Sequence, residues 1–113
     1  MELTQAVDAL SALAQRTRLA VFRLLVREGP NGLSAGEVAE RVGVAPATLS
    51  FHLSQLEGAG LLTARRESRQ IFYAVDIEGA RRLLEFLSED CCQGRPEICG
   101  GLGTALETCG DKR

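Results

Sequence analysis

The sequence predicts a mainly α-helical domain with one small β-hairpin, which places it in the α+β class. Apolar residues recur at helical spacing through roughly the first half of the chain. The pattern changes to the alternation typical of strands from Leu61 to Val75 and then returns to helical spacing as far as Leu87. With 113 residues, the chain is long enough for one ordinary domain and too short for two. We expect this domain to occupy residues 1–89 and a cysteine-containing tail to occupy residues 90–113.

Two helices are expected to begin the domain. Both are indicated by apolar residues three or four positions apart. These residues are Leu3, Val7, Leu10 and Leu13 in the first helix, and Leu19, Phe22, Leu25 and Val26 in the second. The polar stretch "AQRTR" separates the two helices, and "EGPNG" ends the second.

A third, short helix is expected to begin after Ser34. Ser34 suits the N-cap position, and Glu37, three residues later, completes a capping box. This helix should end between Arg41 and Gly43, because a glycine commonly follows the last helical residue.

The fourth helix is expected to begin at Pro46, because proline suits the first helical position. It should end at Gly58 or Gly60. Its inward side is predicted from apolar residues at helical spacing, which are Leu49, Leu53 and Leu56.

The segment "LLTARRESRQIFYAV" predicts a hairpin with strands at Leu61 to Arg65 and Gln70 to Val75. A charged turn over residues 66–69 should join them. Asp76 can then cap a final helix. The apolar residues along one side of that helix are Ile77, Ala80, Leu84 and Leu87.

The distribution of charge favours a phosphate-binding role for the middle of the chain. The whole chain has a formal net charge of -2, which by itself argues weakly against nucleic-acid binding. From Gln15 to Tyr73, however, the chain has eight arginines and five acidic residues, which gives a net charge of +3. From Asp76 to Arg113, the chain has five basic and eight acidic residues, which gives a net charge of -3. The middle of the chain can therefore meet phosphate, whereas the tail should not.

Composition excludes several other classes of protein. Hydrophobic residues make up 45% of the chain and charged residues 25%, which is typical of a globular protein and excludes a disordered one. The N-terminus lacks the pattern of a signal peptide, and no apolar run approaches the length of about 18 residues that spans a bilayer. We expect a cytoplasmic protein that has no membrane partner.

The third and fourth helices, joined by "RVGVAP" and followed by a basic hairpin, are typical of a winged helix-turn-helix. The second helix of such a motif reads the major groove of double-stranded DNA. The alternative is the same fold used for protein contacts alone. We interpret the outward and flanking positions of that helix and the arginines of the hairpin as the DNA-binding residues, namely Thr48, Ser50, Phe51, His52, Gln55, Arg65, Arg66 and Arg69.

Several side chains in this set suit a particular contact with DNA, and two of them also have an alternative role within the domain. Gln55 can bond adenine bidentately, Thr48 can reach a base or a phosphate, and Phe51 can pack on a thymine methyl group. The alternative for Phe51 is packing under the wing. The alternative for His52 is a hydrogen bond to the preceding helix or to a phosphate.

The cysteines are the chain's other unusual feature. All four lie in the last quarter of the chain, at Cys91, Cys92, Cys99 and Cys109. In the cytosol they would be reduced, which favours ligand or redox chemistry over structural disulfides. They lack the paired spacing of a structural zinc site. Two adjacent thiols and a third one suit a soft ion that takes three sulfur ligands, such as arsenite or antimonite. Cys109 can be a fourth ligand, and oxidation to a disulfide is a further alternative.

The chain resembles the ArsR/SmtB family of metalloregulatory repressors from about Ala6 to Leu87. The resemblance rests on "TRLAVFRLL", "LSAGEVAERVGVAPATLSFHLSQLEGAGLL" and "ARRESRQIFYAV". It implies a homodimer, built through the first and last helices, that represses transcription until an inducer weakens its hold on an operator. A two-fold dimer predicts a palindromic operator. No enzymatic role is expected, since the chain has no C-x-x-C pair and no phosphate-binding glycine loop.

The same resemblance narrows the inducer site to the tail. Family sites with cysteines in the third helix or histidines on the last helix have no counterpart, because "LSAGEVAERV" has no cysteine and the segment from Ile77 to Leu87 has no histidine. The segment "DCCQGRPEIC" is similar to that of arsenite-responsive members with an adjacent cysteine pair and a third cysteine. This implies As(III) or Sb(III) as inducer, no organic cofactor, and ligand roles for Cys91, Cys92 and Cys99. Zinc or cadmium sensing and thiol redox sensing remain the alternatives.

Overall fold

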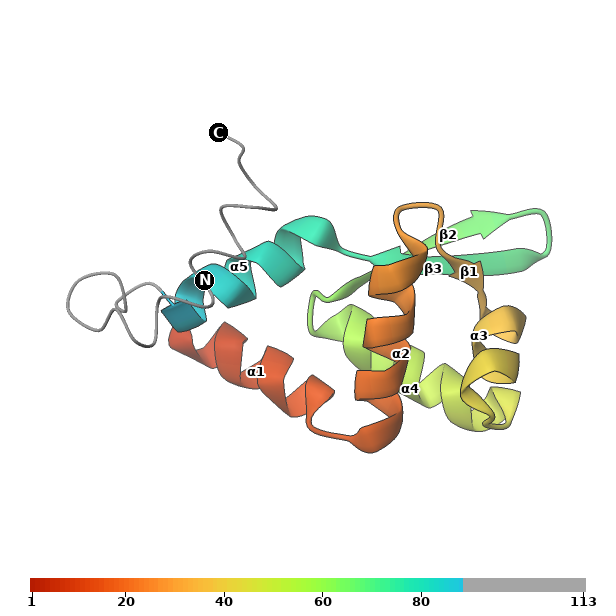
Figure 1. Ribbon diagram of the computed structural model, residues 1–113, viewed down its shortest axis with the longest axis horizontal. Helices are drawn as coiled ribbons and strands as arrows, with labels where there is room; N and C mark the ends of the chain where they lie inside the picture. Colours follow the sequence, from red (N-terminus) through yellow and green to blue (C-terminus); the bar gives the residue numbers. More distant parts are fainter. Residues whose placement is uncertain (89–113) are drawn as a thin grey trace.

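The computed structural model describes residues 1–88, which form five helices and one small sheet (Figure 1). The elements in chain order are α1 (Leu3–Leu13), α2 (Arg16–Glu28), β1 (Leu33–Ser34), α3 (Ala35–Val42), α4 (Pro46–Gly58), β2 (Leu62–Glu67), β3 (Gln70–Val75) and α5 (Ile77–Ser88). The predicted α+β class, all five helices and the hairpin are confirmed. The predicted tail of residues 90–113, with all four cysteines, lies outside the described residues.

The helix starts follow the capping chemistry of the sequence. The Ser34 side chain accepts a hydrogen bond from the backbone nitrogen of Glu37 at 3.2 Å, and the Glu37 carboxylate accepts one from the Ser34 nitrogen at 3.0 Å. Pro46 occupies the first turn of α4, as predicted. Asp76 accepts a hydrogen bond from the Gly79 nitrogen at 3.0 Å and so caps α5. These contacts satisfy amide groups that have no partner within the helix itself.

The sheet has three antiparallel strands in the order β1-β3-β2, and β1 was not foreseen. This strand has two residues, of which Leu33 pairs with Tyr73. Gly32, just before it, has φ +71, and a Cβ there would overlap the Tyr73 carbonyl group. A glycine is therefore needed for the chain to approach β3 so closely.

The second strand has its predicted bounds, but the predicted turn over residues 66–69 is wrong, because the first strand, β2, extends to Glu67. Arg66 pairs with Ile71 and Glu67 with Gln70, which leaves a two-residue turn of Ser68 and Arg69. Ser68 adopts φ 57, a left-handed conformation that usually belongs to glycine or asparagine. The turn lacks those residues, which explains why the sequence did not indicate it.

The core is built around α4, whose Leu49, Leu53 and Leu56 are among the largest fully buried side chains. The other fully buried large side chains of the core are Val21, Leu25, Val38 and Leu61. Helix α1 contributes small residues to this core, namely Ala6, Ala9 and Ala12. Leu3, Val7 and Leu10 lie exposed on the outer side of α1, whereas Leu13 packs against the core.

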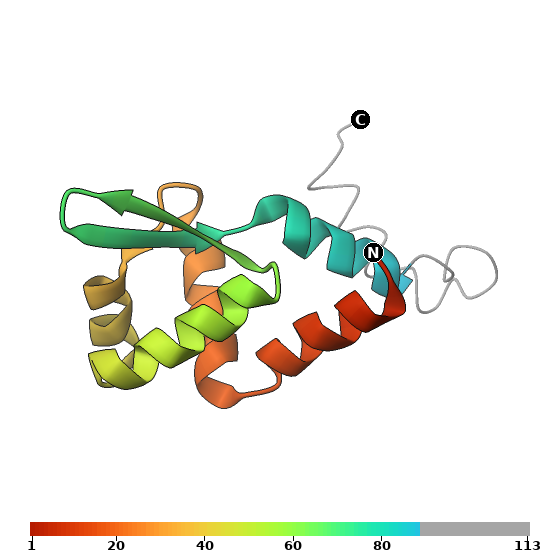
Figure 2. The same ribbon diagram turned by 180° about the vertical axis from the view of Figure 1, so that it is seen from behind.

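The two ends of the described domain differ in character (Figures 1 and 2). Helices α1 and α5 contact each other at one end, whereas α3 and the tip of the β2–β3 hairpin lie at the other. Helix α4 runs between these ends and contacts α1, α2, α3 and β2. Within residues 1–88, no helix has the length and apolar character needed to cross a membrane.

Candidate nucleic-acid interface

Helix α4 has one buried side and one exposed side. Leu49 and Leu53 are each 1% exposed and anchor the inward side. The opposite side carries four of the predicted DNA-binding residues, all exposed, namely Thr48, Ser50, Phe51 and Gln55. Phe51 is 58% exposed, so it does not pack under the wing. A large aromatic side chain at the centre of an exposed helical surface is available for contact with a partner.

His52 points into the domain rather than away from it. The residue is 8% exposed, and its Nδ1 lies 3.1 Å from Nη1 of Arg18 in α2. Because the guanidinium is always a donor, this nitrogen of the imidazole acts as the acceptor. The structure thus directs His52 inward, as the alternative to base contact had it, but its partner lies in α2 and not in the preceding helix, α3.

Arg18 itself was not singled out from the sequence. Its Nε donates to the carbonyl oxygen of Ala12 at 2.6 Å, while Nη1 meets His52. One guanidinium therefore ties the carboxyl end of α1 to the middle of α4. The sequence around it, "AQRTR", offers two arginines and no feature that separates Arg18 from Arg16. What distinguishes Arg18 is tertiary, since His52 lies 34 positions further along the chain.

The arginines of the hairpin fall into two groups. Arg65 is engaged within the domain, because its Nε donates to Glu67 at 2.7 Å and its guanidinium carbon lies 5.2 Å from the centroid of the Phe72 ring. Arg66 and Arg69 are exposed, and neither forms an ion pair within the described part of the chain. Of the three, these two are thus the better placed to meet a phosphate group.

The hydroxyl of Tyr73 in β3 is held neutral at ordinary pH. Burial raises the pKa of Tyr73, and the negative charge of Glu57 in α4 raises it further. Both effects disfavour the charged form of the tyrosine.

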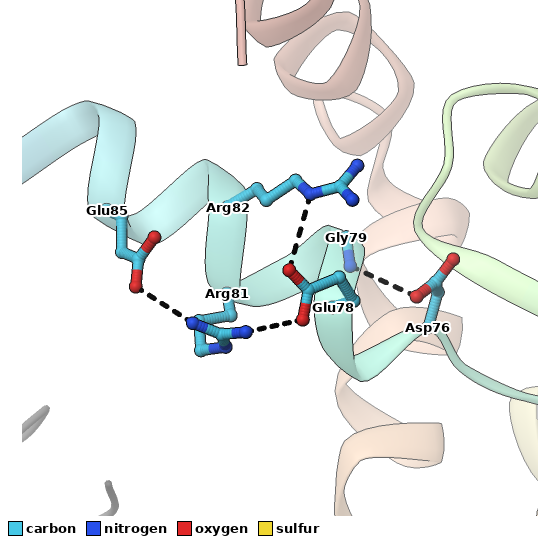
Figure 3. Close-up of polar contacts among 6 residues, drawn as sticks. All are labelled: Asp76, Glu78, Gly79, Arg81, Arg82 and Glu85. Carbon is cyan, nitrogen blue, oxygen red and sulfur yellow. Dashed lines mark hydrogen bonds and ion pairs between the residues drawn. The ribbon is translucent and has the colours of Figure 1, made fainter.

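Helix α5 carries its charges along one side (Figure 3). Arg81 bonds both Glu78 and Glu85, and Arg82 lies 3.4 Å from Glu78. The hydrogen bond to Glu78 and the charges of both carboxylates raise the pKa of Arg81, which stays charged. The exposed large apolar side chains of α5 are Ile77, Leu84 and Leu87.

The predicted ion ligands Cys91, Cys92 and Cys99 lie outside the described residues. Within residues 1–88, the histidine and acidic side chains form no group of three that could hold a metal ion.

Comparison with known proteins agrees with this geometry. The sequence pattern of a helix-turn-helix domain matches residues 13–65. The transcriptional activator HlyU of Vibrio cholerae is 33% identical over 89 residues, which cover 79% of this chain and 80% of HlyU. The homodimeric winged helix-turn-helix DNA-binding domain of a possible ArsR-family regulator from Mycobacterium bovis has a TM-score of 0.64 and 26% identity, covering 78% of this chain and 82% of its own. A crystal structure of a possible transcriptional regulator for arsenical resistance has a TM-score of 0.64 and 26% identity, covering 74% of this chain and 84% of its own.

The two-faced helix α4, the adjoining wing and these matches define the class as winged helix-turn-helix transcriptional regulators. Proteins of this class bind DNA and are not enzymes. Within the class, identity to HlyU over most of both chains and similarity to the Mycobacterium bovis structure show the family. The chain belongs to the ArsR/SmtB family of DNA-binding regulators.

Proposed function

We propose that this chain is a homodimeric repressor that binds a palindromic operator and releases it when As(III) binds three thiolates of its tail. The observation that carries the DNA-binding part is the exposed side of α4, which presents Thr48, Phe51 and Gln55 in a domain whose wing also carries exposed arginines. Gln55 can bond adenine, and Phe51 can contact a thymine methyl group. Arg66 and Arg69 would fix the position of the helix by phosphate contacts.

The dimer is supported by apolar side chains that the domain leaves exposed on its two contacting helices. On α1, Leu3 and Val7 are 69% and 51% exposed. On α5, Ile77 and Leu87 are 64% and 51% exposed. Exposed apolar patches of this kind mark protein–protein contacts. A two-fold dimer formed here would place two α4 helices for major grooves about 34 Å apart, which requires a palindromic operator.

The inducer part of the proposal rests on the donor set. Thiolates are soft ligands, and three of them at Cys91, Cys92 and Cys99 fit an ion that takes three sulfurs. The similarity to a possible regulator for arsenical resistance supports the same choice. The thiols must lose their protons to bind, and the acidic neighbours Glu89 and Asp90 oppose that loss.

Release of DNA would follow from the position of these thiols in the chain. Cys91 comes three residues after Ser88, the last residue of α5. Drawing the three thiols together would twist or fray the end of α5, which is part of the proposed dimer contact. A small shift there would change the spacing of the two α4 helices. A coupling of about 1 to 3 kcal/mol would weaken DNA binding roughly 5- to 150-fold.

The experiment that tests the proposal is retardation of a palindromic DNA fragment by the protein, repeated with arsenite, zinc, cadmium and peroxide. We expect arsenite to abolish retardation and the other three additions to leave it largely unchanged. Release by peroxide in place of arsenite would identify a redox sensor, and release by zinc or cadmium would identify a sensor of those ions. Failure to bind any fragment would remove the DNA-binding function itself.

A further inference from the structure

A pocket of about 350 Å³ lies where α1, the start of α2 and the carboxyl-terminal half of α4 meet. The side chains that give it polar character are Asp8, Ser11, Arg18, Ser54 and Gln55, and Gly58 completes the wall on α4. This volume is at the lower end of the range of about 300 to 1,000 Å³ found for small-molecule sites. The pocket is distant in sequence from the thiols of the tail and needs a separate explanation.

The guanidinium of Arg18 is held rigidly at this pocket. Two of its N–H groups are already used, one by the Ala12 carbonyl oxygen at 2.6 Å and one by His52 Nδ1 at 3.1 Å. A guanidinium has five N–H donors in a planar fork, so three remain. Because two protein contacts fix the plane of the group, the Arg18 side chain would lose little conformational entropy when a ligand binds there.

Both neighbours of Arg18 are neutral, although the residue is partly buried. Among residues 1–88, no carboxylate comes within ion-pair distance of its guanidinium. A partly buried cation with neutral partners is best stabilised by an anion, and a carboxylate matches the fork bidentately. Asp8 lines the same pocket and supplies one negative charge for a cationic group.

We propose that this pocket binds a small zwitterion of the amino-acid class, with its carboxylate on Arg18 and its ammonium group toward Asp8. The hydroxyls of Ser11 and Ser54 would complete the hydrogen bonds of the ligand. A pocket with one positive and one negative side chain favours a net-neutral ligand over a dianion.

Such a ligand would act on DNA binding through the helices that form its pocket. Arg18 links α1, part of the proposed dimer contact, to α4, the proposed reading helix. A carboxylate bound to the same guanidinium would change the hydrogen bond between Arg18 and His52, and this would change the angle of α4. The site would thus be a second effector site, independent of the thiols.

The test uses the full chain with its cysteines reduced and no arsenite present. Each of the protein L-amino acids is added singly at millimolar concentration, and amide chemical shifts are followed by NMR, with acetate and methylammonium as half-ligand controls. We expect at least one amino acid to shift amides of residues 8–12 and 54–58 saturably, and both half-ligands to bind more weakly. No saturable shift with any amino acid, or equal binding of acetate, would overturn the proposal.

Two substitutions test whether the amino acid binds in this pocket. Arg18→Lys keeps the charge but loses the fork, and should weaken binding of the same amino acid about 10-fold or more. Gly58→Leu should fill the pocket, because open space lies beyond the Cβ position of Gly58. Gly36→Leu is the matched control, since Gly36 is also helical with open space around it and lies in α3, outside the pocket. Loss of binding in Gly58→Leu alone supports the site, and retained binding there rejects it.

Discussion

Gly79, in the first turn of α5, lies directly against the carbonyl oxygen of Gly60, in the turn between α4 and β2. The contact is so close that a Cβ on Gly79 would overlap that oxygen. Beside it, the Asp76 nitrogen donates to the Leu61 carbonyl oxygen at 2.9 Å. The start of α5 is therefore fixed to the end of α4, which gives a shift in the proposed dimer helix a direct route to the proposed reading helix.

Substitution of Gly79 by alanine should destabilise the domain. The added methyl group must displace the backbone at Gly60, and overpacking of this kind costs about 1 to 3 kcal/mol. Gly36→Ala is the control, because Gly36 is helical with open space around it and should gain up to about 1 kcal/mol. Urea unfolding followed by circular dichroism measures both. Equal stability of the two variants would mean that the contact between α5 and the turn is loose.

Substitution of Leu87 by glutamate should dissociate the dimer. Leu87 on α5 is 51% exposed in the single chain, and we expect the partner subunit to cover it. A charge buried there without a partner should weaken dimerisation about 10-fold or more. The matched control is Val26→Glu on α2, where the side chain is 53% exposed. Sedimentation equilibrium measures the association constants, and an equal effect of both substitutions would move the dimer contact away from α5.

Substitution of Arg66 by alanine should weaken binding to all DNA sequences alike. A lost phosphate contact lowers the slope of log K against log salt by about one. Arg65→Ala should change that slope less, because Arg65 is already paired with Glu67 and stacked on Phe72. Fluorescence anisotropy over a range of salt concentrations gives the slopes. An unchanged slope for Arg66→Ala would place this side chain in solvent.

Substitution of Cys91, Cys92 or Cys99 by serine should leave operator binding intact and abolish release by arsenite. Serine keeps the size of the side chain but lacks the soft sulfur donor. Cys109→Ser is the internal control and should be close to silent. A variant that still releases DNA normally would remove that cysteine from the site. A change in ion selectivity on Cys109→Ser would instead indicate a site with four sulfurs.

The sequence was sufficient for those parts of the fold that local chemistry determines. The Ser34–Glu37 capping box, Pro46 at the start of α4 and the Asp76 cap each depend on residues within three or four positions of one another. The two-residue strand β1 has no such local pattern, since pairing with β3 forms it. The turn at Ser68 was also missed, because its backbone conformation is imposed by the register of the strands.

In the candidate site, too, the sequence was sufficient for local features but not for those that depend on tertiary contacts. Helical spacing alone placed Phe51 and Gln55 opposite the buried leucines, and the structure has them exposed. Spacing set His52 on the flank of the helix, but it could not reveal the partner Arg18, which lies 34 positions earlier. The difference between Arg65 and Arg66 likewise depends on the strand register, which sets Arg65 opposite Phe72 and Arg66 opposite Ile71.

In the proposed mechanism, three thiolates of the tail hold As(III), and this binding releases the operator. The most direct measurement is arsenite titration of the DNA-bound protein, with X-ray absorption at the arsenic edge to count the sulfur ligands. We expect three sulfur ligands at the point where DNA is released. Arsenic bound by oxygen or nitrogen, or release that is complete before the sulfurs are engaged, would contradict it.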